Sequence, residues 1–331
     1  MNFAVVGCGL IGHKRARSIA KRHHLTVAAD ISLERASALA AQYPGAEATA
    51  DWRIAVNHPR VDAVIVATTN DWLAPISEAA LLAGKHVLVE KPAARNVAEL
   101  ASVITAAASS GKCVQVGFNH RYHRAFRKAR EIFDSGILGP LMFIRARYGH
   151  GGRIGYDREW RANKDLAGGG ELLDQGVHVI DLARWFLGDF TSVQGSTHTY
   201  FWDMPVEDNA FMLLQTHGGQ SAFLHVSCTE WKNCFSFEIY GRHGKLHIEG
   251  LGGSYGVERL YFYRMLPEMG PPETTIWEYP GEDNSWSLEL IDFENATGNR
   301  APEAPDLEIP DLNDARAVLE VVERVYQQAR K

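Results

Sequence analysis

The first 120 residues alternate short apolar runs with longer segments of helical periodicity. The apolar runs predict five strands, at residues 3–6, 25–29, 63–67, 86–89 and 113–116. Helical segments lie between them, for example at residues 32–42 and 74–83, and Gly84 ends the second of these. Strands and helices in alternation are typical of a parallel sheet with crossover helices on both faces. The sequence therefore predicts a doubly wound α/β domain over residues 1–120.

Beyond residue 120 the pattern changes to alternating and aromatic-rich runs. They predict strands at residues 193–202, 210–216, 221–227, 235–240, 245–249 and 259–263. Turn signals at residues 217–219 and 242–244 are typical of antiparallel connections. We therefore expect residues 121–331 to form an α+β domain with a large, mostly antiparallel open sheet. A proline-rich connector, residues 301–310, leads to an amphipathic final helix at 312–328, whose apolar face would pack back onto the protein.

A polar stripe stands out in the apolar stretch GGGELLDQGVHVIDLARW, residues 168–185, which predicts a buried helix. Asp174, His178 and Asp181 are spaced four and then three residues apart, so they fall within about 60° of arc on a regular helix. Buried polar groups need partners, so the stripe faces either hydrogen-bonding residues or a cavity. Asp181 lies one turn beyond the other two, and we expect it to be a structural hydrogen-bonding or salt-bridging residue.

Composition narrows the possible partners. The chain has 331 residues, enough for about two domains, and a net charge of −6, which offers no basic surface for nucleic acid or a membrane. No apolar stretch approaches the ~20 residues of a membrane helix, and the amino-terminal residues show no signal-peptide pattern. The four cysteines show no CxxC spacing, so we expect free thiols in a reducing cytoplasm. The sequence therefore predicts a cytoplasmic protein that acts on a small molecule.

The first strand is followed directly by Gly7-Cys8-Gly9-Leu10-Ile11-Gly12, a GxGxxG motif that opens a helix. In this strand-turn-helix setting the motif indicates a Rossmann domain, because the glycines let the backbone amides approach a pyrophosphate. Asp30 ends the second strand, where a carboxylate binds the ribose hydroxyls and repels a 2′-phosphate. NAD is therefore favoured over NADP, although Arg35 lies nearby.

A lysine follows the strand at residues 86–89, in the sequence VLVEKPAA. Ligands of open parallel sheets sit at the carboxyl ends of the strands, so Lys91 would point into the same crevice as the dinucleotide. The alternative is a solvated surface lysine, and position alone does not decide between them.

The combination of Gly7–Gly12, Glu90-Lys91-Pro92, the GFNHR of residues 117–121 and the GGG that precedes Asp174 and His178 resembles the Gfo/Idh/MocA family of oxidoreductases. The resemblance covers essentially the whole chain. It implies a Rossmann domain, a second domain whose open sheet mediates homodimers or homotetramers, and a catalytic triad of Lys91, Asp174 and His178 at the nicotinamide. One position departs from the family, which commonly has a histidine where this chain has Leu73.

On this basis we expect an NAD-dependent dehydrogenase that oxidises a secondary hydroxyl of a sugar, cyclitol or sugar derivative, with no metal ion. His178 would accept the hydroxyl proton, Lys91 would stabilise the alkoxide, and Asp174 would orient the histidine or a second hydroxyl. The triple glycine would let the chain pass close to the nicotinamide. The cofactor is expected to be bound by Gly7, Gly9, Leu10, Ile11, Gly12, Asp30, Thr68, Asn70, Glu90 and Lys91. The substrate is expected to be bound by Lys91, Asn119, Arg121, Trp160, Arg161, Asp174 and His178.

The segment at residues 148–165 combines glycines, aromatic rings and arginines, which suit a sugar ring and a carboxylate or phosphate. A nucleotide-linked or anionic substrate therefore stays open. Two further function classes also stay open: a redox-neutral glycosidase that holds NAD permanently, and a non-catalytic dinucleotide sensor. The presence of Lys91 and His178 argues against the sensor. A carbonyl or imine reductase differs from the dehydrogenase only in its physiological direction.

Overall fold

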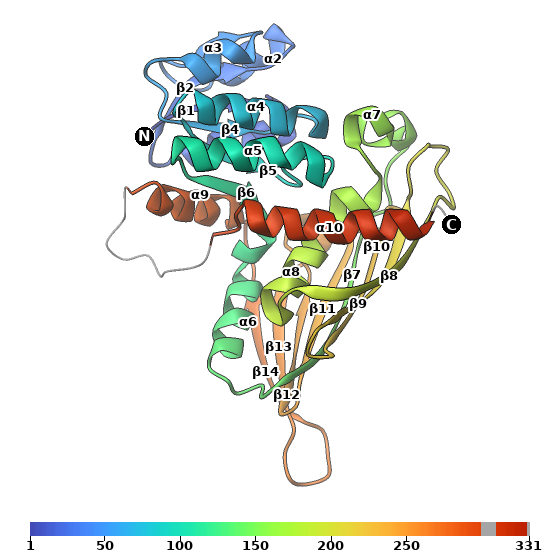
Figure 1. Cartoon of the computed structure of the whole chain (residues 1–331). Coiled ribbons are helices and arrows are strands. Elements are labelled where there is room, and N and C mark those ends of the chain that lie inside the picture. Colours follow the sequence, from blue (N-terminus) through green and yellow to red (C-terminus); the bar gives the residue numbers. More distant parts are fainter. Residues whose placement is uncertain (299–308, 330–331) are drawn as a thin grey trace. The chain divides into compact units, whose positions relative to one another are not determined.

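The fold is taken from a computed structural model that describes residues 1–298 and 309–329 (Figure 1). The chain divides into two compact units. Unit 1 comprises Met1–Phe118, Asp165–Gly168 and the described part of Trp286–Arg316. Unit 2 comprises Asn119–Lys164, Gly169–Ser285 and the described part of Ala317–Lys331.

Unit 1 is built on a six-stranded sheet in the order β3-β2-β1-β4-β5-β6, in which every pairing is parallel. This confirms the predicted doubly wound fold, whose strand order reverses between β1 and β4. The strands are β1 (Asn2–Val6), β2 (His24–Ala29), β3 (Glu47–Thr49), β4 (Ala63–Val66), β5 (His86–Glu90) and β6 (Val114–Gly117). The sequence did not predict β3, because it has only three residues and no buried apolar run.

Crossover helices connect these strands, and α4 and α5 lie side by side over the sheet (Figure 1). The helices are α1 (Leu10–Ile19), α2 (Leu33–Ala40), α3 (Trp52–Asn57), α4 (Asn70–Leu82) and α5 (Val97–Ser110). Local sequence sets several of their ends. The side chains of Ser32, Asp51 and Asn96 accept backbone N–H groups at the amino ends of α2, α3 and α5, and Gly111 ends α5 in a left-handed conformation.

A late segment of the chain returns to unit 1, which differs from the expected single division at residue 120. Helix α9 (Ser285–Ala296) places Leu290 and Phe293 in the same hydrophobic cluster as Phe3 and Leu88. The ring centroids of Phe3 and Phe293 are 6.3 Å apart. The apolar core of unit 1 is therefore completed by residues nearly 300 positions away from its first strand, and a local sequence pattern carries no signal of that pairing.

Unit 2 contains an eight-stranded sheet in the order β14-β13-β12-β11-β7-β10-β9-β8. Only β7 and β10 pair in parallel, so the predicted mostly antiparallel sheet is confirmed. The strands are β7 (Leu141–Gly149), β8 (Phe190–His198), β9 (Asn209–Thr216), β10 (Ser221–Ser227), β11 (Cys234–Gly241), β12 (Gly244–Glu249), β13 (Glu258–Arg264) and β14 (Glu273–Tyr279). The sequence missed β7 and β14.

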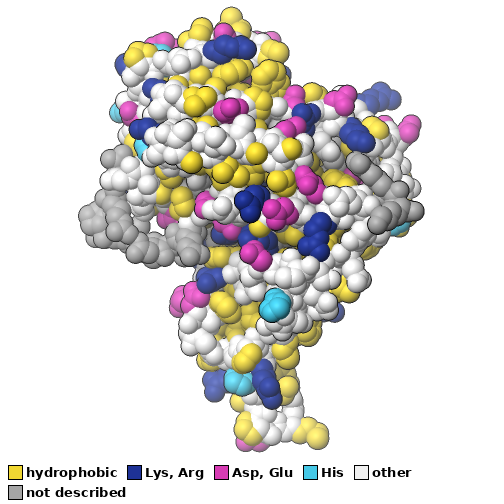
Figure 2. All heavy atoms as spheres, viewed as in Figure 1, with side chains coloured by type: hydrophobic (Ala, Val, Ile, Leu, Met, Phe, Trp, Pro, Cys, Tyr) yellow, Lys and Arg dark blue, Asp and Glu magenta, His cyan; other side chains and the backbone are white. Residues whose placement is uncertain are grey.

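The predicted strand 193–202 ends at His198 because a buried carboxylate bends the chain after it. Asp208 accepts the backbone N–H groups of Tyr200, Phe201 and Trp202. At the opposite end of the sheet, the turn between β13 and β14 carries exposed Met265 and Met269. Figure 2 shows hydrophobic side chains in yellow at the lower end of the view, where Figure 1 draws this turn.

Helices cover one face of the unit 2 sheet. They are α6 (Arg124–Asp134) and α8 (Val177–Leu187), while α7 (Lys164–Ala167) is a single short turn. On the other face Phe143, Leu213 and Phe223 are exposed, and their sequence neighbours Ile144, Leu214 and Leu224 are fully buried. This alternation is the mark of a sheet with one packed and one open face.

The final helix α10 (Leu312–Ala329) forms as expected and belongs to both units. In unit 2 it lies along β8, where Arg324 donates to the Thr191 carbonyl (2.9 Å) and Gln328 to the Val193 carbonyl (2.7 Å). Of the predicted connector 301–310, only residues 309 and 310 lie within the described residues. All four cysteines are free, and none of the described helices is long and apolar enough to span a membrane.

Candidate functional site

Three loops that carry predicted site residues leave the same edge of the unit 1 sheet. Gly7 follows β1, Thr68 follows β4 after one residue, and Lys91 follows β5. The three strands are consecutive neighbours in the sheet and run in parallel. The loop after β1 and the lysine after β5 are therefore separated by two strand spacings, or about 10 Å.

The glycine loop has the shape that a dinucleotide pyrophosphate requires. Gly7 has φ +97°, and a Cβ there would lie 2.3 Å from the Ala67 carbonyl oxygen. A Cβ on Gly12 would lie 2.0 Å from the carbonyl oxygen of Gly7. A Cβ on Gly9 would meet nothing within 4 Å among the described residues. The first and third glycines thus pack against protein, whereas the second opens to the outside.

Helix α1 begins at Leu10, directly after this opening, and no described side chain caps it. Its first amides lie at the positive end of the helix dipole, where they suit a phosphate group. Leu10 is largely exposed and Ile11 half-buried. The loop therefore fits the expected dinucleotide, and Gly9, Leu10 and Ile11 stand at the position predicted for its pyrophosphate.

Asp30, at the end of β2, is held by three donors. Its carboxylate accepts the backbone N–H groups of Cys8 (2.8 Å) and Ser32 (2.9 Å) and the guanidinium of Arg35 (2.6 Å). Burial alone raises the pKa of this carboxyl, but the hydrogen bonds from Arg35, Ser32 and Cys8 outweigh it and lower the pKa below its usual value. Asp30 is therefore an ionised acceptor beside the glycine loop, with an arginine that the sequence had identified as a competing signal.

The turn after β4 is ordered by its own side chains. Thr69 donates to Asp71 (2.6 Å) and the buried Asn70 donates to the Ala167 carbonyl (2.9 Å), while Thr68 bonds to the Thr69 carbonyl. Leu73, where the resembled family commonly has a histidine, is fully buried in α4. Packing thus explains the apolar residue at that position.

Glu90, the last residue of β5, takes part in a buried ion-pair network immediately before Lys91. Arg15 of α1 donates to Glu90 (2.7 Å) and to Glu289 of α9, and its guanidinium lies 4.5 Å from the ring centre of Trp286. Burial lowers the pKa of Arg15, but the two carboxylates outweigh that effect and raise it. The side chain of Glu90 therefore has a structural partner, and its contact with the cofactor stays a prediction. Lys91 is half-buried.

In unit 2, the predicted helix from residue 168 is interrupted. Leu172–Gly176 forms a π-helical turn, and α8 begins only at Val177. The arc calculated for a regular helix therefore does not apply to Asp174, which lies in the wider π turn. Such turns are frequent at functional sites. Asp174 is half-buried, whereas His178 and Asp181 are buried.

The glycines before this turn pack closely within unit 2, and their expected approach to a nicotinamide stays a prediction. A Cβ on Gly169 would lie 2.0 Å from the Tyr326 hydroxyl, and one on Gly170 would lie 2.0 Å from the Glu207 carbonyl oxygen. The carboxylate of Glu207 accepts the N–H groups of Gly170 and Leu172 (both 3.1 Å) and the Tyr326 hydroxyl (2.7 Å). Burial raises the pKa of Glu207. The sequence missed Glu207 and Tyr326.

His178 lies in a stack of rings. Its imidazole is 3.8 Å from that of His120, with 23° between the planes, and 6.3 Å from the ring of Tyr148. His120 Nδ1 contacts the Asn119 side-chain oxygen (3.1 Å), and the Asn119 amide donates to Ser285 (3.0 Å). Asn119 therefore holds the ring against which His178 rests, and its direct contact with substrate stays a prediction.

Arg121 and Asp181 form a buried bidentate ion pair, with distances of 2.8 and 2.6 Å. Both side chains are at least 95% buried, and the guanidinium also faces the Trp185 ring. This agrees with the structural role expected for Asp181. It gives Arg121 a structural role as well, because the pair fastens the turn at residues 119–122 to the helix that carries His178.

Arg161 pairs with Asp174, an arrangement that the sequence did not predict. The guanidinium Nε donates to the Asp174 carboxylate (3.0 Å) and lies 4.6 Å from the ring centre of Trp160. The charge of Asp174 raises the pKa of Arg161. Trp160, Arg161 and Asp174 thus form one contiguous group in unit 2, and the arginine charge is balanced by a carboxylate of the same protein.

Sequence reasoning also missed a polar pair beside Asp174, made by the half-buried His150 and the buried Glu171. His150 Nε2 lies 3.4 Å from the carboxylate of Glu171, and its ring packs edge-on against Tyr156 at 5.4 Å. Burial raises the pKa of Tyr156, and the charges of Glu171 and Asp174 raise it further. The glycine-rich segment 148–165 therefore lies against the π turn.

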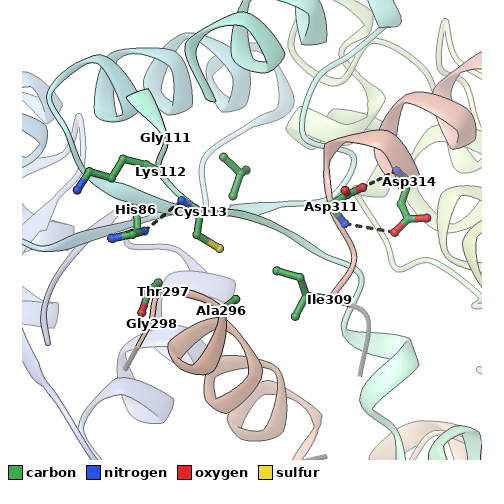
Figure 3. A pocket seen from close by; sticks show the side chains of 11 residues that line it. His86, Gly111, Lys112, Cys113, Ala296, Thr297, Gly298, Ile309, Asp311 and Asp314 are labelled. Carbon is green, nitrogen blue, oxygen red and sulfur yellow. Dashed lines mark hydrogen bonds between the residues drawn. The ribbon is translucent and has the colours of Figure 1, made fainter. Parts of the chain in front are cut away.

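Unit 1 has a pocket at the opposite edge of its sheet, near the amino ends of β5 and β6 (Figure 3). His86 and Cys113 lie on one side, with the Cys113 N–H donating to His86 Nδ1 (3.1 Å), and Asp311 and Asp314 lie on the other. None of the predicted site residues lines it. This pocket is therefore separate from the glycine loop and Lys91.

Comparison with known proteins gives two adjoining family matches. Residues 1–118 match the NAD-binding Rossmann fold of an oxidoreductase family, and residues 126–247 match the GFO/IDH/MocA C-terminal domain. Levoglucosan dehydrogenase from Pseudarthrobacter phenanthrenivorans is 32% identical over 197 residues, which span 59% of this chain and half of that protein. A 1,5-anhydro-D-fructose reductase from Ensifer adhaerens is 33% identical over 78% of this chain and 83% of its own length.

Solved structures show the same fold. A levoglucosan dehydrogenase in complex with NADH superposes with a TM-score of 0.89 at 22% identity and covers 100% of this chain and 97% of that chain. At this identity the likeness concerns the fold of the chain.

Two glycine substitutions test the glycine loop. We expect Gly9→Ala to fold normally and to weaken NAD binding, because its Cβ faces open space where the pyrophosphate is expected. Gly12→Ala should lower the free energy of unfolding by about 1–3 kcal/mol or more, because its Cβ meets backbone. Urea unfolding and a fluorescence titration with NAD measure the two effects. Unchanged NAD affinity in Gly9→Ala would show that the loop does not hold the pyrophosphate.

Proposed function

The chain belongs to the Gfo/Idh/MocA family of oxidoreductases, and from this premise we propose that it is an NAD-dependent dehydrogenase that oxidises a secondary hydroxyl of a sugar, cyclitol or related polyol. One observation carries the proposal. Lys91 follows β5 at the same sheet edge as a glycine loop whose shape suits a pyrophosphate. Two of its relatives are named for reactions of sugar derivatives, which supports the substrate class.

The cofactor would be held by the unit 1 edge, with Gly9–Gly12 at the pyrophosphate, Asp30 at the adenosine ribose and Thr68 and Asn70 along the remainder. When bound, the nicotinamide supplies the acceptor for the hydride that leaves the carbinol carbon. Glu90 contributes by fixing the end of β5 through Arg15, and Lys91 extends from that fixed point. The remaining steps of the proposed reaction would be carried out by side chains of the protein.

Lys91 would bind the substrate hydroxyl and stabilise the alkoxide that forms as the proton leaves. A ring nitrogen of His178 would accept that proton, since imidazole is a suitable base near neutral pH. Asp174 would accept a second substrate hydroxyl, held in place by Arg161 (3.0 Å). The proposal thus assigns one reaction to Lys91, His178 and Asp174.

Arg161 bears on the charge of the substrate. Its ion pair with Asp174 neutralises the guanidinium, so a carboxylate or phosphate would have to compete with a protein carboxylate for it. We therefore favour a neutral polyol over an anionic or nucleotide-linked sugar. Trp160, whose ring lies under the same guanidinium, would contact the sugar ring.

We also propose that two or four copies associate through the open face of the unit 2 sheet. Phe143, Leu213 and Phe223 are exposed there on neighbouring strands, and Phe143 stacks on Tyr240 at 4.1 Å. An apolar sheet face of this kind is typical of a protein–protein interface. Sedimentation of the purified protein measures the mass, and a monomer that persists at high concentration would contradict the proposal. Phe223→Asp should shift the protein towards the monomer.

The choice of cofactor is tested at Asp30 and Arg35. We expect the unmodified protein to have a higher kcat/KM with NAD than with NADP, because the ionised Asp30 repels a 2′-phosphate. Asp30→Asn should reduce this ratio about tenfold or more, the scale of a hydrogen bond to a charged group. Arg35→Ala should increase the ratio, since it removes a cation that would attract the phosphate. Preference of the unmodified protein for NADP would refute the assignment.

The reaction itself is tested by NADH formation with free sugars, cyclitols, sugar acids and nucleotide sugars. We expect Lys91→Ala and His178→Ala each to lose at least ~10²-fold in kcat, the usual effect of removing an acid–base group, while both still bind NAD. Lys112→Ala, at the opposite edge of the same sheet, is the matched control and should keep full activity.

Two outcomes separate the remaining function classes. Product without net NADH would identify the redox-neutral glycosidase, and NAD binding without turnover of any substrate would identify the sensor. Near-normal kcat in either site variant would remove that residue from the mechanism.

A further inference from the structure

A group of aromatic side chains in unit 2 has no part in the proposed chemistry. Phe201 and Trp231 are 54% and 73% exposed, and Trp202 is half-buried between them and the segment at residues 148–165. The rings of Phe201 and Trp231 pack edge-to-face with centroids 4.8 Å apart. We call Phe201, Trp202 and Trp231 the aromatic rim. Large exposed aromatic rings that contact one another mark a binding surface more often than isolated ones do.

Hydrogen bonds to buried groups hold the turn that carries Phe201 and Trp202. Asp208, which is fully buried, accepts the backbone N–H groups of Phe201 (2.8 Å) and Trp202 (3.1 Å). Burial raises the pKa of Asp208, but hydrogen bonds from Asn209 and the turn outweigh it and lower the pKa, so the acceptor stays ionised. The Trp202 ring nitrogen also donates to the Cys228 carbonyl (2.9 Å). The exposed rings therefore need little ordering before they bind a ligand.

Trp231 adopts a backbone conformation that disfavours a bulky residue. Its φ is +59°, in the left-handed region where side chains other than glycine and asparagine are uncommon. Gly151 leaves room for the Trp231 backbone, because a Cβ on Gly151 would lie 2.8 Å from the Trp231 carbonyl carbon. Strained residues of this kind concentrate at ligand-binding positions. The strain is retained while the ring stays mostly exposed, so burial of the tryptophan does not explain it.

The rim is continuous with the group around Asp174 in the same unit. Trp202 contacts Tyr156 (5.6 Å), and Tyr156 contacts His150 (5.4 Å). His150 in turn lies 3.4 Å from Glu171, which is three residues from Asp174. The rim thus extends outwards from the residues that we assign to substrate binding.

We propose that Phe201, Trp202 and Trp231 form a second subsite, which binds a ring attached to the sugar that is oxidised. This inference rests on the proposed function and specifies its substrate as a glycoside, such as a disaccharide or an aryl glycoside. Aromatic faces attract the C–H face of a sugar ring or another aromatic ring, and they need no charge on the ligand. The subsite would therefore select for size and apolar surface beyond the reacting ring.

The test compares the methyl and the phenyl glycoside of the same sugar, with the sugar chosen by NADH formation. The phenyl glycoside should have the lower KM. Trp231→Ala and Phe201→Ala should each raise the KM of the phenyl glycoside roughly two- to tenfold, the scale of one aromatic contact, and leave the methyl glycoside and NAD unchanged. Tyr200→Ala is the matched control, since Tyr200 is exposed on the same turn but stacks on His198.

A second measurement separates this inference from the proposed function. If no sugar gives NADH, the dehydrogenase is refuted, and phenyl glucoside serves as the probe instead. Its binding, followed by tryptophan fluorescence, should still weaken in Phe201→Ala, which would keep the subsite. Equal KM changes for both glycosides, or no change in either variant, would overturn the subsite. A lower sedimentation coefficient in both variants would also overturn it, because the rim would then contact a second copy of the chain.

Discussion

The arrangement of the unit 2 site depends on one buried carboxylate. Glu207 binds two amides at the entrance to the π turn, and its third donor is a tyrosine of the last helix. The turn approaches Glu207 so closely that only glycine fits at residue 170. A buried carboxylate is costly unless its hydrogen bonds are complete, and here they draw together three segments far apart in sequence. These hydrogen bonds thereby position the turn that carries Asp174 and leads to His178.

In unit 1, a buried arginine likewise joins segments that are far apart in sequence. Arg15 lies between Glu90 and Glu289, so it connects the first helix, the end of β5 and the returning helix α9. Removing one member of such a network leaves an uncompensated buried charge, which is strongly destabilising. The network adjoins both the helix that opens at Gly9 and the residue before Lys91. In each unit, therefore, a buried hydrogen-bonded network contacts the segment that carries the residues we assign to chemistry.

The sequence predicted the features that depend on local spacing. The period of apolar residues located five of the six strands of unit 1, and it placed the glycine motif and Glu90-Lys91-Pro92 at the carboxyl ends of two of them. It did not predict contacts between distant residues. The ion pairs of Arg161 with Asp174 and of Arg121 with Asp181 were missed, because the partners lie 13 and 60 residues apart in the chain. The substrate contacts of both arginines stay predictions. Likewise, nothing in a local pattern shows that Phe293 completes the core around Phe3.

The central proposal is that Lys91 and His178 act on the same hydroxyl, and a double-mutant cycle tests it most directly. The measurement is kcat/KM for the unmodified protein, Lys91→Ala, His178→Ala and the double variant with one substrate. If both groups serve one proton transfer, the loss in the double variant will be close to that of the more impaired single variant. A loss equal to the product of the two single losses would show that the residues act independently, and would contradict the account.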